Sequence, residues 1–116
     1  MVVNKPTIII YSREPDEDLL REVCAGIEEE GVLHQVLSRK GELDDLAYEA
    51  AKESMLGCGI GIYGTSLAMQ MQRLPKGHNV FELCKPRFWQ CRNLGANSAR
   101  AIKKMPFKPV TGDEPL

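Results

Sequence analysis

Residues 7–12, with the sequence TIIIYS, join β-branched and aromatic side chains in succession without polar alternation. Strands of this kind lie at the centre of parallel sheets, where both faces of the sheet are covered. A chain with such a strand must supply a layer of helix for each face. The segment therefore predicts a central strand of an α/β domain.

Residues 16–31 follow with the spacing of an amphipathic helix, because positions 19, 20, 23, 24 and 27 form one apolar stripe. Both ends of this helix are signalled. Pro15 lies where a first-turn proline is tolerated, and Asp16, Glu17 and Asp18 place negative charge at the positive end of the helix dipole. Gly31 is suited to a left-handed cap at the other end.

The alternation of strands and helices continues along the chain, with strands expected at 33–37, 59–63, 66–72 and 80–84 and helices from 43 to about 55 and at 88–104. Strand, helix, strand, helix, strand requires parallel, right-handed connections. Residues 66–72 alternate with period two after the tight turn at 64–65, which predicts an antiparallel strand. A helix is the alternative there, because Leu, Ala, Met and Gln are good helix formers.

These elements predict one three-layer α/β/α domain over residues 1–116, with a five-stranded, mostly parallel mixed sheet that contains one antiparallel strand. From about 106 to 116 the chain is polar and interrupted by Pro106 and Pro109, and we expect a mobile tail there.

Charge and cysteine content narrow the classes of function. Fifteen Lys and Arg against sixteen Asp and Glu give a formal net charge of −1, so no global field favours nucleic acid or an anionic membrane. The longest apolar run is too short to cross a bilayer, and the N-terminus lacks the apolar core of a signal peptide. The four cysteines form no C-x-x-C pair, and two histidines give no zinc-ligand spacing. We expect a cytosolic protein with reduced thiols and no metal or cofactor of its own.

The C-terminal end of the 16–31 helix carries an unusual charge. Glu28, Glu29 and Glu30 lie at the negative end of the dipole, which costs roughly 0.3–1 kcal/mol per exposed charge. Gly26 costs about 1 kcal/mol relative to alanine inside a helix, and it shares a face with Glu22, Glu29 and Glu30. A solvated acidic turn is the simpler interpretation. The alternative is a partner interface, formed by Glu22, Gly26, Glu29 and Glu30, that offers a carboxylate to a metal or basic patch and allows another backbone to approach closely.

The last helix is basic, with Lys85, Arg87, Arg92, Arg100, Lys103 and Lys104 in or near it. A binder of single-stranded nucleic acid would show more aromatic residues than 6%. An acidic helix and a basic helix in one chain fit a heteromeric protein interface better. Within 93–98, two Asn and one Gly weaken the helix, so this stretch is interpreted as a helix start or cap with available N–H groups.

Residues 59–64, GIGIYG, match the G-x-G-x-x-G string of dinucleotide sites. That fingerprint requires the glycines after the first strand and at the start of a helix, whereas here they lie inside the third predicted strand. Glycines in a strand more often mark close backbone approach. No nucleophile and base are evident. A small nucleotide- or cobalamin-binding domain that uses the 59–64 loop nevertheless stays open as an alternative, as does an interaction module with an unrelated partner.

Several segments together resemble the small subunit of glycerol/diol dehydratase reactivase: the stretches 20–23 (LREV) and 26–31 (GIEEEG), the run 93–100 (NLGANSAR) and Pro106-Phe107. The resemblance covers nearly the whole chain. Within 62–74 the charged and histidine residues typical of the family are replaced, so the resemblance says nothing about contacts made there.

The resemblance implies a non-catalytic, chaperone-like subunit that is similar in fold to the medium subunit of the dehydratase. It implies a large ATPase subunit as partner, with Mg²⁺ and ATP or ADP bound in that partner. The complex would release damaged cobalamin from inactivated adenosylcobalamin-dependent dehydratase by subunit exchange. By the GIEEEG match, Glu29 corresponds to a glutamate that reaches a metal in the large subunit. Target dehydratase (glycerol or propanediol), stoichiometry and association with a bacterial microcompartment stay open.

Overall fold

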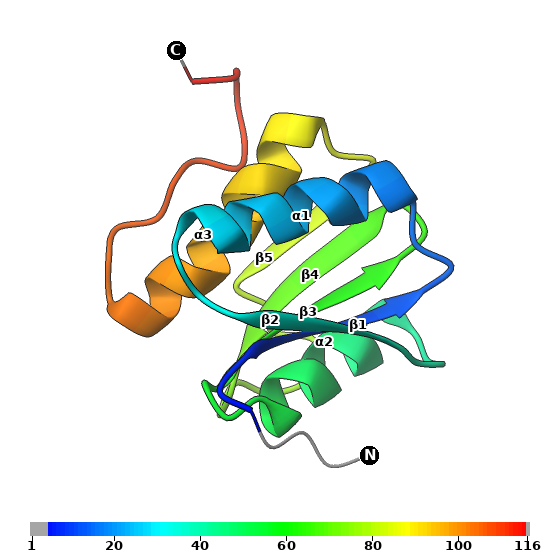
Figure 1. Ribbon diagram of the computed structural model, residues 1–116. Helices are drawn as coiled ribbons and strands as arrows, with labels where there is room; N and C mark the ends of the chain where they lie inside the picture. Colours follow the sequence, from blue (N-terminus) through cyan, green and yellow to red (C-terminus); the bar gives the residue numbers. More distant parts are fainter. Residues whose placement is uncertain (1–4, 116) are drawn as a thin grey trace.

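A computed structural model describes residues 5–115 (Figure 1). Five strands and three helices follow one another in the order β1 (Ile8–Arg13), α1 (Glu17–Glu29), β2 (His34–Ser38), α2 (Leu43–Glu53), β3 (Cys58–Tyr63), β4 (Ser66–Met71), β5 (Phe81–Cys84) and α3 (Phe88–Lys103). Helices α1 and α3 cover one face of the sheet, and α2 covers the other (Figure 1). The predicted three-layer architecture is confirmed.

The sheet has the strand order β2-β1-β3-β4-β5. Strand β1 pairs in parallel with β2 and β3, while β4 is antiparallel to both β3 and β5. A two-residue turn at 64–65 joins β3 to β4, with Tyr63 opposite Ser66 and Gly64 at φ +61°. The mostly parallel sheet and its single antiparallel strand are therefore confirmed, and the helical alternative for 66–72 is wrong.

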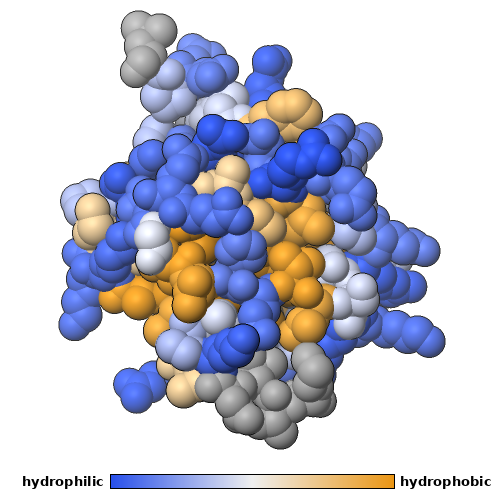
Figure 2. Space-filling model, viewed as in Figure 1, coloured by the Kyte–Doolittle hydropathy of each residue, from blue (hydrophilic) through white to orange (hydrophobic). Residues whose placement is uncertain are grey.

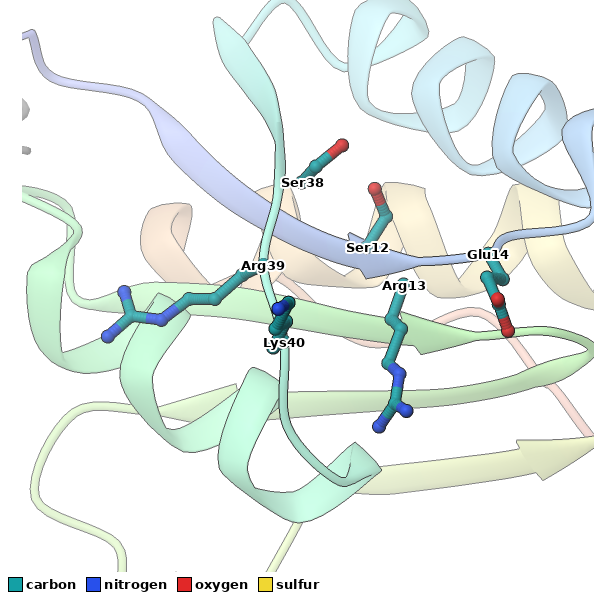
Figure 3. Close-up of a pocket in the computed structure, with 6 residues that line it drawn as sticks. All are labelled: Ser12, Arg13, Glu14, Ser38, Arg39 and Lys40. Atoms are coloured by element: carbon teal, nitrogen blue, oxygen red, sulfur yellow. The ribbon is translucent and has the colours of Figure 1, made fainter.

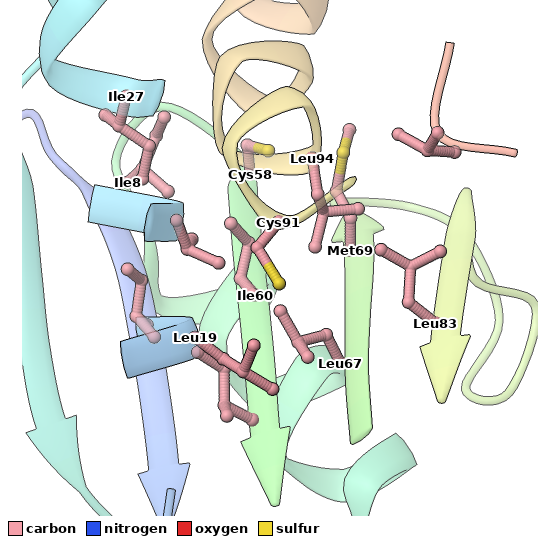
Figure 4. Close-up of a cluster of buried hydrophobic side chains, with 14 of the residues drawn as sticks. Ile8, Leu19, Ile27, Cys58, Ile60, Leu67, Met69, Leu83, Cys91 and Leu94 are labelled. Carbon is pink, nitrogen blue, oxygen red and sulfur yellow. The ribbon is translucent and has the colours of Figure 1, made fainter. Parts of the chain in front are cut away.

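Strand β1 lacks polar alternation because both of its faces are buried. Ile8 and Ile10 belong to the larger hydrophobic cluster, which includes residues of α1 and α3 (Figure 4). Ile9 and Tyr11 point to the opposite face and pack against Leu46 and other residues of the α2 side. The central position of β1 in the sheet is thus the position that its sequence pattern predicts.

Helix α1 has a well-defined start and end. Asp16 is the N-cap, and its carboxylate accepts hydrogen bonds from the N–H groups of Asp18 (3.0 Å) and Leu19 (3.1 Å). Gly31 follows the helix at φ +76° and donates to the carbonyl oxygen of Glu28 (3.0 Å). Both predicted end signals lie where the helix begins and ends.

Helix α2 packs very close to β3, and the glycines of that strand make this possible. A Cβ atom on Gly59 would lie 2.2 Å from the nitrogen of Ala51, and one on Gly61 would lie 2.6 Å from the nitrogen of Ala47. Alanines on the inner face of α2 complete the contact. The strand interpretation of these glycines is confirmed, and Gly59 and Gly61 do not form a loop open to a ligand.

The C-terminal segment departs from prediction. Asn97 of α3 donates to the Lys108 carbonyl (2.8 Å) and accepts from the Lys108 N–H (2.7 Å). Val110 is buried, and the ring of Phe107 meets that of Phe81 edge to face at 5.2 Å. Expected mobility was therefore wrong for 106–110, because side-chain amides of a helix hold this segment; residues 111–115 are exposed.

Candidate partner-binding surface

Helices α1 and α3 are in backbone contact. A Cβ atom on Gly26 would lie 2.0 Å from the carbonyl oxygen of Arg92, and one on Gly95 would lie 2.1 Å from that of Val23. Each glycine thus makes room for the other helix. The backbone expected to approach Gly26 from a partner chain is that of α3 in the same chain, and Gly26 is buried. The close approach at Gly26 is thus accounted for within the chain, and its place in a partner interface stays a prediction.

Carboxylates of α1 pair with cations of α3. Glu22 Oε1 lies 2.9 Å from both Nε and Nη2 of Arg92. Glu30 Oε2 lies 3.2 Å from Arg100 Nε, and its Oε1 lies 3.6 Å from Lys103 Nζ. Lys103 also donates to the backbone carbonyl of Glu30. The cations that the acidic helix end requires are supplied within the chain.

This pairing leaves the Glu30 side chain only 11% exposed, and its place in a partner interface stays a prediction. Glu22 is engaged by Arg92 in the same way and is 22% exposed. The acidic and basic helices, which we interpreted as two halves of a heteromeric interface, neutralise each other instead. Three of the six basic residues near α3 are used in this way, which further weakens the case for a nucleic-acid patch.

Glu28 and Glu29 remain on the outer side of α1. Glu29 is 55% exposed, and its Oε1 lies 3.6 Å from Arg92 Nε. Glu28 is 66% exposed, with His34 Nε2 at 3.9 Å. Glu29 is therefore a loosely held carboxylate on a rigidly packed helix.

A single carboxylate of this kind fits a magnesium ion, which binds through one or two carboxylates and keeps several waters. Residues 5–115 contain no group of three or more side chains able to hold a metal together. Glu29 would consequently have to act with ligands of another molecule.

The run 93–98 does not form a helix start. It lies inside α3, where Leu94 to Ala99 are buried. Asn93 donates to the carbonyl of Pro109 (2.8 Å), and Ser98 donates to that of Gly95 (2.6 Å). These side chains serve the fold, and the expected free N–H groups are used in helix bonds.

The crevice at the carboxyl ends of β1 and β3 is closed. In a sheet of this order, the chain leaves β1 and β3 in opposite directions at that point, and ligands of α/β proteins bind there. Here the Asp16 N–H donates to the Gly64 carbonyl (2.9 Å), and the Gly64 N–H donates to the Arg13 carbonyl (3.2 Å). The Arg13 guanidinium lies 4.5 Å from the centre of the Tyr63 ring. The Asp16 carboxylate at the start of α1 is also unfavourable to a phosphate.

A shallow pocket lies beside this crevice, at the ends of β1 and β2 (Figure 3). It is lined by Ser12, Arg13, Glu14, Ser38, Arg39 and Lys40. Its arginines already bind groups of this chain. Arg13 donates to the Gly41 carbonyl (3.1 Å), and Arg39 bonds Glu53 (3.0 Å) and stacks on Tyr11 at 4.6 Å. Both arginines are therefore engaged in contacts within the chain.

Hydrophobic side chains gather at the centre of the face seen in Figure 2, where Figure 1 places β2 and the lower side of α1. Leu33 and Val36 are exposed on or beside β2. Polar and charged side chains surround them (Figure 2). Apolar side chains within a polar rim are typical of a protein–protein interface.

The thiols are free, as predicted from their spacing. Cys58 and Cys91 are buried, Cys24 is half-buried and Cys84 is exposed. Burial raises the pKa of Cys58 to about 12 and that of Cys24 to about 11, with the Glu28 charge adding to the latter. No helix of the described part is long and apolar enough to span a bilayer.

Known proteins share this fold and about a third of this sequence. Residues 5–108 match the family model of the dehydratase medium subunit. The chain is 34% identical over 110 residues to the diol dehydratase-reactivating factor small subunit of Klebsiella michiganensis, covering 93% of this chain and 88% of that one. It is 35% identical over 107 residues to the propanediol dehydratase-reactivating factor small subunit of Salmonella typhimurium, covering 90% and 92%.

Two solved structures are similar, each with a TM-score of 0.86. The first is diol dehydratase-reactivating factor complexed with ADP and Mg²⁺, 34% identical, covering 91% of this chain and all of that one. The second is glycerol dehydratase reactivase, 26% identical, covering 92% and all of that chain. The chain thus belongs to the dehydratase medium subunit family, among the small subunits of dehydratase-reactivating factors.

Proposed function

We propose that this chain is a non-catalytic subunit that binds a large ATPase subunit, and that the complex releases damaged cobalamin from inactivated adenosylcobalamin-dependent dehydratase by subunit exchange. One observation carries the proposal: the chain matches the full length of a reactivating-factor chain at a TM-score of 0.86. The match of residues 5–108 to the dehydratase medium subunit supports exchange with that subunit.

The chain is proposed to bring no cofactor of its own. ADP and Mg²⁺ accompany the similar reactivating factor, and here they would be bound by the large subunit. Glu29 is the residue that the GIEEEG match assigns to that Mg²⁺, and its carboxylate is free enough to move because it is 55% exposed and lies 3.6 Å from its nearest cation. When bound, the metal would supply a nucleotide-dependent link between the subunits, since Mg²⁺ is sensitive to small shifts of its few protein ligands.

The two other interpretations have less support. A nucleotide- or cobalamin-binding domain would use the crevice beside Gly64, which backbone hydrogen bonds close. An unrelated interaction module would not account for similarity over nine tenths of the chain to reactivating-factor subunits.

The test is co-purification of the chain with the large ATPase subunit of a dehydratase-reactivating factor, in Mg²⁺ with ADP or ATP, followed by an assay of inactivated dehydratase. We expect a stable complex that restores activity. Glycerol and propanediol dehydratases would be assayed side by side to identify the target. A chain that elutes alone under every condition would refute the proposal.

The role of Glu29 is tested separately with Glu29→Gln. We expect weaker binding to the large subunit in Mg²⁺, and the same affinity as the unchanged chain in EDTA. Glu28→Gln is the matched control, because Glu28 is the adjacent residue and is similarly exposed. Equal affinities of the two variants in Mg²⁺ would remove Glu29 from the interface.

A further inference from the structure

Arg92 lies between two carboxylates of α1. Its guanidinium is bonded to Glu22 at 2.9 Å, and its Nε is 3.6 Å from Glu29 Oε1. Glu22 is thus the main partner of Arg92, and Glu29 a secondary one. Arg92 is itself 45% exposed, so water screens the Glu29 contact.

We propose that Arg92 is an internal competitor for Glu29: in the free chain it binds the carboxylate that the large subunit's Mg²⁺ would take in the complex. This inference rests on the proposed metal contact of Glu29. A guanidinium and a divalent cation repel each other, so the Glu29 carboxylate satisfies one at the expense of the other. Arg92 therefore weakens the magnesium contact and keeps the two subunits separable.

The competition is reversible because Glu22 stays with Arg92 when Glu29 leaves. A buried cation without a partner would oppose release, but here two bonds of 2.9 Å remain. Exposed ion pairs contribute little to stability, so breaking the 3.6 Å contact between Arg92 and Glu29 costs little free energy. Exchange of Glu29 between the two cations then requires only a side-chain rotation.

The fold fixes the distance over which this competition acts. Gly26 and Gly95 bring the two helix backbones together, and Arg92 supplies the very carbonyl that Gly26 accommodates. Arg92 and Glu29 therefore start from backbone positions that cannot drift apart. A residue that acts on Glu29 in this way is a positioning residue, and it need not touch the metal.

The experiment measures the dissociation constant of the complex with the large subunit in ADP, once with Mg²⁺ and once with EDTA. For Arg92→Gln we expect about two- to fivefold tighter binding in Mg²⁺, the range of an exposed ion pair, and no change in EDTA. Arg92→Lys keeps the charge and should stay close to the unchanged chain. Glu22→Gln should have the opposite effect, because it leaves Arg92 with Glu29 as its carboxylate partner on α1.

Arg100→Gln is the matched control, since it removes the same charge from the same helix and breaks an ion pair with Glu30 instead. Thermal unfolding would show that each variant is folded. If Arg92→Gln binds no tighter than Arg100→Gln, or binds more weakly, the competitor role is refuted. In the Glu29→Gln background the effect of Arg92→Gln must vanish. Loss of the Glu29 effect itself would instead refute the proposed metal contact of Glu29, and loss of the complex would refute the proposed function.

Discussion

At the scale of single residues, two glycines decide how α1 and α3 meet. Gly26 faces the Arg92 carbonyl and Gly95 faces the Val23 carbonyl, so the contact is reciprocal. Each glycine weakens its own helix, and the close approach gained between the helices offsets that cost. The same approach places Glu22 and Glu30 within reach of Arg92 and Arg100.

Gly26→Ala should destabilise the protein by about 3 kcal/mol, the upper part of the range for an overpacked core, since the new methyl would meet a carbonyl oxygen at 2.0 Å. The better helix propensity of alanine cannot compensate for this clash. The measurement is urea unfolding followed by circular dichroism. Ala25→Ser, on the adjacent and less buried position, is the control and should change stability by about 0.5 kcal/mol or less. Equal stabilities of the two variants would contradict the reciprocal packing.

At the scale of elements, α3 has a second task besides covering the sheet. Three of its amide side chains bond backbone groups of the C-terminal segment: Gln90 to Val110, Asn93 to Pro109 and Asn97 to Lys108. Asn93 and Asn97, which weaken α3 as a helix, are thus two of the residues that hold this segment. These asparagines stabilise the tertiary structure and not the helix itself.

Asn97→Ala should loosen residues 106–110, because Asn97 is fully buried and makes both hydrogen bonds of Lys108. We expect a loss of about 1–3 kcal/mol. Limited trypsin digestion is the sharper readout, with faster cleavage after Lys104, where the helix ends. Asn93→Ala removes a single, exposed bond and serves as the control. Similar cleavage rates for both variants would argue against Asn97 as the main anchor.

Each element was predictable because its signal is local. Strand β1 follows from six residues, the ends of α1 from Asp16 and Gly31, and the direction of β4 from its alternation and the turn before it. The pairing of α1 with α3 was not predicted, because it joins residues about 70 positions apart. A glycine in the middle of each helix, with opposite charges around them, was the available signal. For the same reason the sequence did not show that Glu22 and Glu30 are paired within the chain, and the predicted role of Glu29 depends on another molecule.

At the scale of the whole molecule, the buried thiols link stability to pH. The pKa of Cys58 is raised to about 12 by burial, while an unfolded thiol titrates near 9.0. Between these values the unfolded chain loses the proton and the native chain keeps it, so stability falls as pH rises. Below pH 9 both states hold the proton and the dependence disappears.

For Cys58 we expect a slope of about −1.4 kcal/mol per pH unit between pH 9 and 12. Urea unfolding at pH 8.0, 9.5 and 10.5 would measure it, with Cys58→Ala as the comparison. The alanine variant should be less stable at pH 8.0 and should lack this part of the slope, so the difference in stability between the two proteins should narrow as the pH rises. Parallel curves for the two proteins would show that the thiol ionises in the native state.

The closed crevice at Gly64 has a consequence for how such a chain can change over time. In other proteins of this fold the crevice holds a ligand, but here two backbone hydrogen bonds close it, and neither depends on the side chains of Arg13 or Asp16. What another molecule meets is then the outline of the domain and the charges on its helices. Substitutions in the interior that preserve this outline would leave binding to a partner unchanged. Moving one carboxylate to another position on α1 would change that binding.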